Sequence, residues 1–220
     1  MTRSWPSQAN LSLFLFLSIM VGFVLPSVGF ERNNLQLYGV CAFSLMSLFG
    51  AALAWDNRIL LASTLLVSMV SIVLRWMAWW TPTRTLTLWS VSTGLAAIAA
   101  ITVVLLWQVF RPGPVTRMRV EGAIAAYLCL GVCWAHAYHI TALLDSAAFD
   151  VTRGNVALPT TWVNYSFGVL TTIGYAGIVP AKPYAHSLGS SEAVTGQLYL
   201  AVLVARLVAK QVSAADGDHP

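Results

Sequence analysis

Long apolar runs separated by short polar segments dominate this sequence, and six of the runs are long enough to cross a lipid bilayer. A membrane-spanning helix needs about 20 consecutive apolar residues. The pattern therefore predicts an all-α membrane protein with six transmembrane helices. In chain order the runs are Leu11–Phe30, Leu35–Trp55, Ile59–Trp79, Thr85–Phe110, Gly122–Leu144 and Leu188–Val208.

Composition agrees with this fold class. Of the 220 residues, 58% are hydrophobic and 9% are charged, whereas a soluble domain carries about 25% charged residues. A soluble helical bundle would need a polar face on each helix, and the charge-free runs leave none. The first run could instead be a signal peptide with Arg3 as its basic flank. Its length and the lack of an A-x-A cleavage motif favour an uncleaved span.

The charge distribution predicts an orientation. The chain has 12 basic and 8 acidic residues, and most basic residues lie between the apolar runs, which indicates membrane topology rather than nucleic-acid binding. Arg111, Arg117 and Arg119 follow the fourth run, and basic loops stay in the cytoplasm. Both termini are therefore expected in the cytoplasm. Tryptophans suit a membrane interface, and four of them cluster at the proposed outer turn. These are Trp76, Trp79, Trp80 and Trp89.

The link between the fifth and sixth runs, Asp145–His186, is much longer than any other. Its first part, DSAAFDVTRGNVALP, is expected to be an exposed loop. The next part, TTWVNYSFGVLTT, is apolar and predicts a short helix that begins near Thr160 or Thr161, after Pro159, with threonine as its N-cap. A helix of this length cannot span a bilayer, so the pattern indicates a re-entrant segment.

The residues that follow this helix, Thr172–Gly177, read TIGYAG. Glycine tolerates left-handed backbone angles, and alternating right- and left-handed angles would point successive carbonyl oxygens to one side. Irregular backbone at membrane depth is tolerated only where it is buried in protein or lines water. Oxygens gathered in such a dry place suit a dehydrated cation.

The segment TTIGY, Thr171–Tyr175, resembles the T-x-G-Y-G filter of tetrameric potassium channels, in which carbonyl oxygens replace the hydration shell of the ion. The match extends through YSFGVLTTIGYAGIVP and EAVTGQLYLAVLVARLV. These stretches resemble the pore helix, filter and inner helix of bacterial two-transmembrane pore modules. The resemblance covers the chain from Gly122 to Lys210.

The resemblance implies a role for each matching residue. The backbone carbonyls of Thr172, Ile173, Gly174 and Tyr175, with the Thr172 hydroxyl, would coordinate potassium. The side chains of Ile173 and Tyr175 would point backward and pack against the short helix. Gly196 lies where the family has a flexible glycine in the inner helix. It is either a gating hinge or a small residue that allows close helix packing.

The resemblance also implies a function and an assembly. The chain would be the pore-forming subunit of a potassium-selective channel in a bacterial inner membrane, conducting passively and not acting as an enzyme. Its partners would be potassium ions and the lipid bilayer, with no cofactor and no nucleic acid. One re-entrant loop cannot encircle an ion, so a homotetramer is expected. The predicted domains are a four-helix domain (1–115), a pore module (116–211) and a polar tail (212–220).

Two residues at the filter edge depart from the family pattern, which ends G-Y-G-D. Ala176 replaces a glycine that normally adopts left-handed angles, and such angles cost a non-glycine residue about 1–2 kcal/mol. Gly177 replaces an aspartate that draws cations to the outer mouth. A weakly selective or non-conducting relative of these channels therefore stays open as an alternative.

The first four runs resemble the layout of six-span channels without their voltage sensor. A voltage sensor needs a series of arginines along the fourth span, and Thr85–Phe110 contains none. Arg75 and Arg84 flank the outer turn and form no series. These runs are therefore expected to be a scaffold or a sensor of another stimulus.

Several further side chains carry open alternatives. Cys129, Cys133 and His136 share one helix face, and they either bind a soft metal or pack as small and aromatic residues, with packing favoured. His136 and His139 are alternatively groups that titrate near neutral pH. Glu192 is either a functional group or a hydrogen-bond partner of the short helix, and Arg206 is expected to snorkel to the cytoplasmic surface.

Two other function classes compete with the channel. Secondary transporters carry broken helices in matching halves, and this chain has one re-entrant segment, in its second half. A membrane enzyme or adaptor would need polar catalytic residues that converge in the membrane, and the sequence offers no convincing set.

Overall fold

The computed structural model describes residues 8–19, 40–41, 43–50, 58–112, 116–152, 158–174 and 177–216. Most of the first two predicted spans lies outside these residues, as do Tyr175 and Ala176. The helices are α1 (Gln8–Ile19), α4 (Arg58–Trp80), α5 (Arg84–Phe110), α6 (Arg117–Leu144), α7 (Pro159–Leu170) and α8 (Pro183–Asp216), and the strands are β1 (Phe149–Val151) and β2 (Ile178–Pro180). Residues 43–50 are also helical.

Within the described part of the chain, four helices are long and apolar enough to cross a membrane, namely α4, α5, α6 and α8. They coincide with the third to sixth predicted runs, so the prediction of an all-α membrane protein is confirmed at this level. Their side chains agree with contact to lipid, because large apolar residues such as Leu66 and Val204 lie 66% and 57% exposed. The last turns of α8 extend through Asp216, into the segment expected to be a polar tail.

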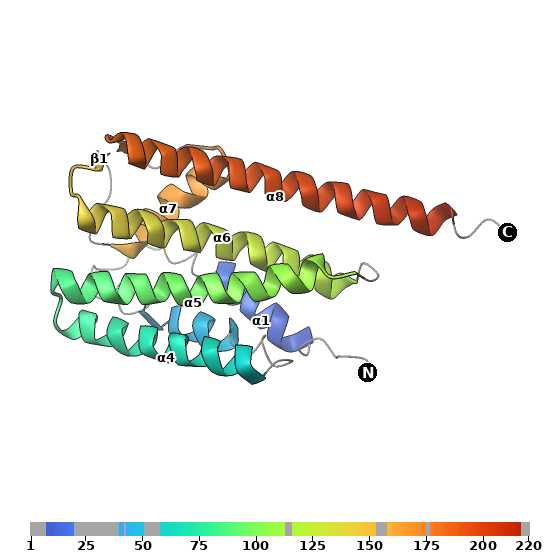
Figure 1. The fold of residues 1–220 in the computed structure, drawn as a ribbon, viewed down its shortest axis with the longest axis horizontal. Helices are drawn as coiled ribbons and strands as arrows, with labels where there is room; N and C mark the ends of the chain where they lie inside the picture. Colours follow the sequence, from blue (N-terminus) through green and yellow to red (C-terminus); the bar gives the residue numbers. More distant parts are fainter. Residues whose placement is uncertain are drawn as a thin grey trace.

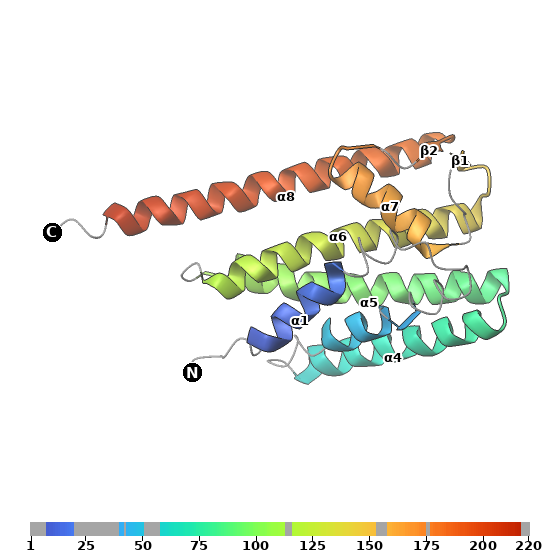
Figure 2. The same cartoon turned by 180° about the vertical axis from the view of Figure 1, so that it is seen from behind.

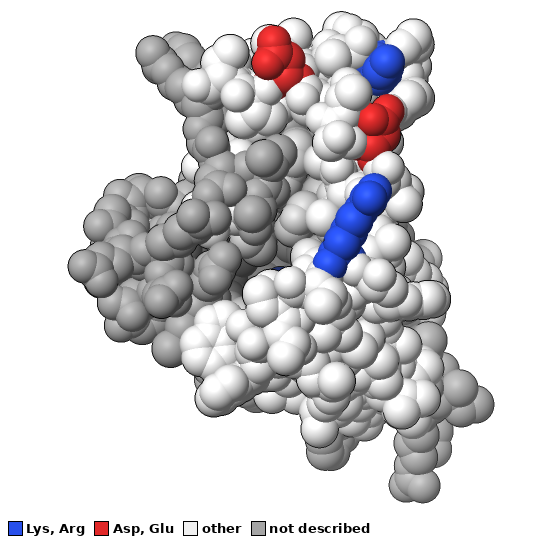
Figure 3. Space-filling model, turned by 90° about the vertical axis from the view of Figure 1, so that its left-hand side faces the viewer, with Lys and Arg blue, Asp and Glu red and all other residues white. Residues whose placement is uncertain are grey.

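The long helices lie side by side in the order α4, α5, α6 and α8, and α7 lies between α6 and α8 (Figures 1 and 2). The two strands lie at one end of this bundle, while the start of α1 and the end of α8 lie at the other. Seen from the strand end, the surface is mostly uncharged, with a few acidic and basic side chains (Figure 3). The chain thus forms an apolar bundle with a short helix inserted between two of its spans.

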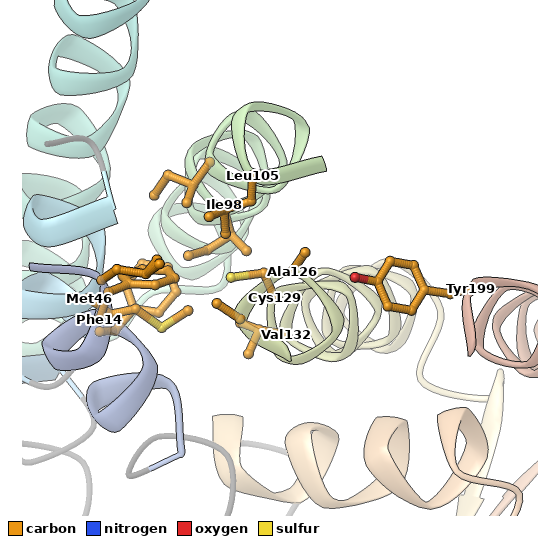
Figure 4. Packing of buried hydrophobic residues seen from close by; sticks show 12 residues of the cluster. Phe14, Met46, Ile98, Leu105, Ala126, Cys129, Val132 and Tyr199 are labelled. Atoms are coloured by element: carbon orange, nitrogen blue, oxygen red, sulfur yellow. The ribbon is translucent and has the colours of Figure 1, made fainter. Parts of the chain in front are cut away.

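A buried apolar cluster joins the N-terminal helices to the later ones. Phe14 and Met46 face Ile98 of α5 and Cys129 of α6, and Tyr199 of α8 points toward α6 from the other side (Figure 4). The Tyr199 hydroxyl donates a hydrogen bond to the carbonyl of Ala123, at 2.7 Å. α6 is therefore the central helix, packed on both the N-terminal bundle and α8.

The segment after α6 corrects the expectation of an exposed loop. Phe149 is 7% exposed and belongs to β1, which pairs antiparallel with β2 in the register Phe149↔Pro180 and Val151↔Ile178. The Phe149 ring packs edge-on against Trp162 of α7 and Tyr138 of α6. Burying this ring against two other aromatic rings outweighs the loop-like composition of its neighbours.

The start of α7 also differs from the expectation. Its N-cap is Leu158, without a side-chain cap, and Pro159 is within the first helical turn. Proline suits this position because the N–H that it lacks would have no partner within the helix. The prediction of a threonine N-cap was therefore wrong, and the short apolar helix itself, Pro159–Leu170, is confirmed.

Candidate functional site

Two glycines hold α7 close to its neighbouring helices. A Cβ on Gly131 of α6 would lie 2.7 Å from the Phe167 ring, and a Cβ on Gly196 of α8 would lie 2.6 Å from the carbonyl oxygen of Leu170. Only a hydrogen fits at either position, because real Cβ atoms do not approach other heavy atoms so closely. α7 is thus wedged between α6 and α8, and Gly196 acts in close packing in this structure.

A buried polar cluster ties the same three helices together. It consists of Tyr138 and the Gly131 carbonyl on α6, Ser166 on α7 and Glu192 on α8, and we call it the Glu192 cluster. The Tyr138 hydroxyl lies 2.5 Å from Oε2 of Glu192, and the Ser166 hydroxyl lies 2.5 Å from Oε1 and 2.6 Å from the Gly131 carbonyl oxygen. Glu192 is fully buried. The cluster fixes α7 about one turn before the segment that resembles a filter.

That segment begins with a tight turn at the end of α7. The N–H of Thr172 bonds the Val169 carbonyl, and the N–H of Gly174 bonds the Gly168 carbonyl, both at 3.0 Å. Thr172 has φ 61° and Gly174 has φ 79°, while Ile173 between them is not left-handed. A β-branched residue at positive φ is strained. The two backbone hydrogen bonds therefore stabilise a backbone conformation at Thr172 that threonine would otherwise avoid.

The far end of the segment is anchored by the strand pair. Gly177 has φ 62°, and its carbonyl accepts hydrogen bonds from both the N–H and the hydroxyl of Thr152, each at 3.0 Å. β2 follows directly and pairs with β1. The short stretch between Gly174 and Gly177 is therefore held at both ends. Its middle residues, Tyr175 and Ala176, lie outside the described residues.

The expected filter residues Thr172, Ile173 and Gly174 have the following contacts and exposure in the single chain. The Thr172 hydroxyl donates to the Thr171 carbonyl at 2.7 Å. The side chain of Ile173 is 58% exposed, so it does not pack fully against α7 as expected. A Cβ on Gly174 would meet nothing within 4 Å, so this residue faces open space. The segment thus presents the Ile173 side chain and the backbone at Gly174 to the outside of one chain.

A second polar cluster lies on the opposite side of α6. Nη2 of Arg75, on α4, lies 3.2 Å from Nε2 of His136, and its guanidinium stacks 3.9 Å above the Phe43 ring. Nδ1 of His136 donates to the Val132 carbonyl at 2.8 Å, so Nε2 accepts from the arginine. Together with His139, these residues form what we call the Arg75 cluster. It joins the N-terminal helices to α6.

The Arg75 cluster is incompletely hydrogen-bonded. Nε of Arg75 and Nε2 of His139 are buried and have no hydrogen-bond partner in the described part of the chain. Gly94 of α5 makes room for the contact, since a Cβ there would lie 2.8 Å from Nη2 of Arg75 and 3.0 Å from Nε2 of His136. The three helices α4, α5 and α6 therefore meet at one polar junction.

The two cysteines of α6 contact the apolar interior and a threonine hydroxyl. Cys129 is fully buried in the apolar cluster, and Sγ of Cys133 lies 3.7 Å from the Thr102 hydroxyl. His136 is engaged by Arg75. Across the ranges that the structure describes, no three His, Cys, Asp or Glu side chains come together as metal ligands would.

Polar contacts also connect the helix ends at the strand end of the bundle. There, Arg84 donates to the carbonyls of Leu143 and Leu144, which end α6. At the same end, hydrogen bonds from the Tyr184 hydroxyl and the Ala147 N–H lower the pKa of Asp145. These contacts fix the end of α6 and the start of α8, which flank the α7 segment.

At the opposite end, Nη2 of Arg206 on α8 lies 2.7 Å from the Arg111 carbonyl oxygen, and its guanidinium stacks over Phe110. The side chain that was expected to snorkel to the surface therefore links α8 to the end of α5.

Sequence reasoning missed Ser166 and Tyr138 as partners of Glu192, although it marked Glu192 as a possible partner of the short helix. A signal was present, because a buried acid in an apolar span needs hydrogen-bond donors nearby. It also missed the inward position of Arg75. The isolated charge within an apolar run was the available signal there.

Comparison with protein-family models, with curated proteins and with solved structures finds no match for this chain. The case for a function therefore depends on the geometry of these residues and on the resemblance in the filter segment.

Proposed function

We propose that the chain is the pore-forming subunit of a potassium-selective channel. The observation that carries the proposal is the position of α7. This short helix is wedged between two membrane-spanning helices by Gly131 and Gly196, and it ends in backbone where Thr172 and Gly174 have positive φ. A segment that enters the membrane as a short helix and returns to the same side as irregular backbone must be surrounded by protein or must line water, because lipid cannot satisfy its backbone groups.

The order of elements supports this proposal. α6, α7, the Thr171–Gly177 segment and α8 follow one another as outer helix, pore helix, filter and inner helix do in the family that the sequence resembles. The exposure of Thr172, Ile173 and Gly174 on the single chain fits a surface that neighbouring copies complete. Four copies would place four such segments around one axis.

The orientation follows from the same proposal. The filter segment leads into β2 at the strand end of the bundle, and Arg111, Arg117 and Arg119 belong to the end of α5 and the start of α6, which lie at the other end. Basic segments stay in the cytoplasm, so the strand end would face outward. This places the start of α1 and the end of α8 on the cytoplasmic side of a bacterial inner membrane.

A weakly selective pore is the second candidate, and one sequence feature favours it. Ala176 and Gly177 stand where potassium-selective relatives have glycine and aspartate. Loss of the four aspartates would weaken the attraction of cations to the mouth. Such a pore would share the architecture and differ in the ratio of potassium to sodium permeability.

Reconstitution tests the proposal. The purified chain is inserted into liposomes with a potassium gradient, and ion efflux is followed beside empty liposomes, while mass measurement in nanodiscs gives the number of copies. We expect a tetramer that releases potassium faster than sodium. A tetramer that releases both ions equally would favour the weakly selective pore, and a folded preparation that stays monomeric or carries no ion would refute the channel.

A further inference from the structure

Glu192 is a fully buried acid in a helix that can cross a membrane, and it belongs to a chain of three short oxygen–oxygen contacts, two of which it makes itself. These are Tyr138 Oη to Glu192 Oε2 at 2.5 Å, Ser166 Oγ to Glu192 Oε1 at 2.5 Å, and Ser166 Oγ to the Gly131 carbonyl oxygen at 2.6 Å. Each distance is short enough to require a hydrogen between the two oxygens.

Counting hydrogens decides the protonation state of this cluster. Each hydroxyl, of Tyr138 and of Ser166, carries one hydrogen, while a carbonyl and a carboxylate carry none. If Glu192 is ionised, two hydrogens must serve three contacts, and one pair of oxygens is left facing without a hydrogen. If Glu192 is neutral, three hydrogens serve three contacts. Glu192 then donates to Ser166, Ser166 donates to the Gly131 carbonyl, and Tyr138 donates to Glu192.

The surroundings favour the neutral form. No basic side chain forms an ion pair with Glu192 within the described residues. The titratable groups that face it are Tyr127 and Tyr138 from α6 and Tyr165 from α7. Tyrosine is uncharged below a pH of about 10, so these groups offer no positive charge. Burying a carboxylate without a cation is far more costly than burying the neutral acid.

We propose that Glu192 is the positioning residue of the re-entrant helix and acts as a neutral acid, linking α8 through Ser166 and Tyr138 to α7 and α6. When alkaline solution removes the proton from Glu192, only two hydrogens remain for the three contacts. The two oxygens left without a hydrogen then repel each other, and the contact between α7 and α8 is released. The link from α7 to the filter segment makes this a way for pH to alter conduction. That last consequence depends on the proposed channel function, whereas the protonation and the positioning do not.

The protonation is tested on the wild-type chain by nuclear magnetic resonance. The sequence has three glutamates, Glu31, Glu121 and Glu192, so labelling the side-chain carboxyl carbon of glutamate gives three signals. Glu192→Gln removes one and assigns it. We expect the Glu192 signal to be that of a neutral acid at a pH of about 7, where an unperturbed glutamate is ionised. Glu121, paired with Arg117 at 2.9 Å, should then give a carboxylate signal.

The positioning role is tested with two variants. The glutamine amide has one acceptor oxygen and an NH2 group with two N–H donors. In Glu192→Gln the oxygen can accept from Tyr138, and one N–H can donate to Ser166, at any pH. Alanine satisfies neither. Hydrogen exchange in α7, corrected for the intrinsic pH dependence, should rise in the wild-type chain from about pH 7 to about pH 10. It should stay low in Glu192→Gln and be high at every pH in Glu192→Ala.

The experiments test the protonation and positioning role of Glu192 separately from the channel function. A carboxylate signal for Glu192 at neutral pH, or Glu192→Gln exchanging in α7 like Glu192→Ala, would overturn the inference, whatever the chain conducts. If the exchange results hold, potassium efflux should fall at alkaline pH by about tenfold in the wild-type chain and by less than about twofold in Glu192→Gln. Absence of efflux from every folded form would count against the channel and leave the positioning role of Glu192 in place.

Discussion

The two buried polar clusters on either side of α6 differ in how completely they are hydrogen-bonded. In the Glu192 cluster every contact measures 2.5–2.6 Å, and each polar group has a partner when the acid is neutral. In the Arg75 cluster the main contact measures 3.2 Å, and Nε of Arg75 and Nε2 of His139 have no partner among the described residues. A satisfied buried network specifies one arrangement, whereas a partly satisfied one leaves others close in free energy.

This difference in hydrogen bonding suits the two clusters to different roles. The Glu192 cluster includes Ser166 of α7, just before the segment that we propose as a filter, and such a filter would need fixed geometry to distinguish ions. The Arg75 cluster lies where α4 and α5 meet α6, between the N-terminal helices and the proposed pore module. We expect substitutions in the first cluster to cost much more stability than substitutions in the second.

The largest effect is expected for Gly196→Ala. The added Cβ would meet the Leu170 carbonyl oxygen at 2.6 Å, and backbone cannot move aside cheaply, so we expect a loss of about 2–3 kcal/mol. Gly189→Ala is the matched control on the same helix, because its Cβ would have ordinary contacts with the Tyr165 and Tyr138 hydroxyls at 3.7 and 3.9 Å. Unfolding in denaturing detergent measures both. Equal stability of the two variants would favour the hinge interpretation of Gly196.

Ser166→Ala should follow in size. It removes the bridge between Glu192 and the Gly131 carbonyl, which leaves one buried oxygen of Glu192 without that partner and costs about 1–3 kcal/mol. Ser187→Ala is the control, since that exposed hydroxyl bonds only the Pro183 carbonyl four residues before it, and a loss within about 0.5 kcal/mol is expected. Similar losses for both serines, in the same unfolding assay, would mean that the Glu192 cluster contributes little.

Gly94→Ala adds a Cβ beside the Arg75 cluster, as Gly196→Ala does between α7 and α8. Its Cβ would meet the ends of two side chains, Nη2 of Arg75 at 2.8 Å and Nε2 of His136 at 3.0 Å. Side-chain ends shift more easily than backbone, and alanine is the better helix former, so a net loss of about 1 kcal/mol or less is expected. A loss as large as that of Gly196→Ala would show that the packing around the Arg75 cluster is as rigid as the packing between α7 and α8.

The smallest effect is expected for Arg75→Met. Methionine keeps an unbranched apolar side chain at this position, and it removes a guanidinium that stacks over Phe43 and forms no ion pair in the part of the chain that the structure describes. Replacing a poorly compensated buried charge by an apolar side chain is often neutral or stabilising, so we expect a change within about 1 kcal/mol. A strong destabilisation in thermal unfolding would mean that Arg75 has an anionic partner elsewhere.

The parts of the fold that depend on local pattern were predictable. α4, α5, α6 and α8 follow from apolar runs of spanning length, and α7 follows from a run that is too short to span. The left-handed angle of Gly174 follows from its residue type. That of Thr172 does not, because threonine avoids such angles and adopts one here through the hydrogen bonds that close the turn after α7.

The parts that depend on distant contacts were not predictable from the sequence. Glu192 meets Ser166 across 26 positions and Tyr138 across 54, and Arg75 meets His136 across 61. Uniformly apolar helices have no polar stripe to show which face turns inward. β1 was missed for a related reason, because its burial comes from aromatic rings of α6 and α7 and not from its own three residues.

The most direct test of the central claim is the ratio of potassium to sodium efflux from liposomes that hold the Gly174→Ala variant, beside Gly189→Ala. Gly174 has φ 79°, where alanine is strained, although a Cβ there would meet no atom within 4 Å. A change that strains the backbone of this segment without crowding it should therefore abolish the preference for potassium, while Gly189→Ala should keep the wild-type ratio. If a folded, tetrameric Gly174→Ala chain kept that ratio too, this segment would not be the selectivity filter.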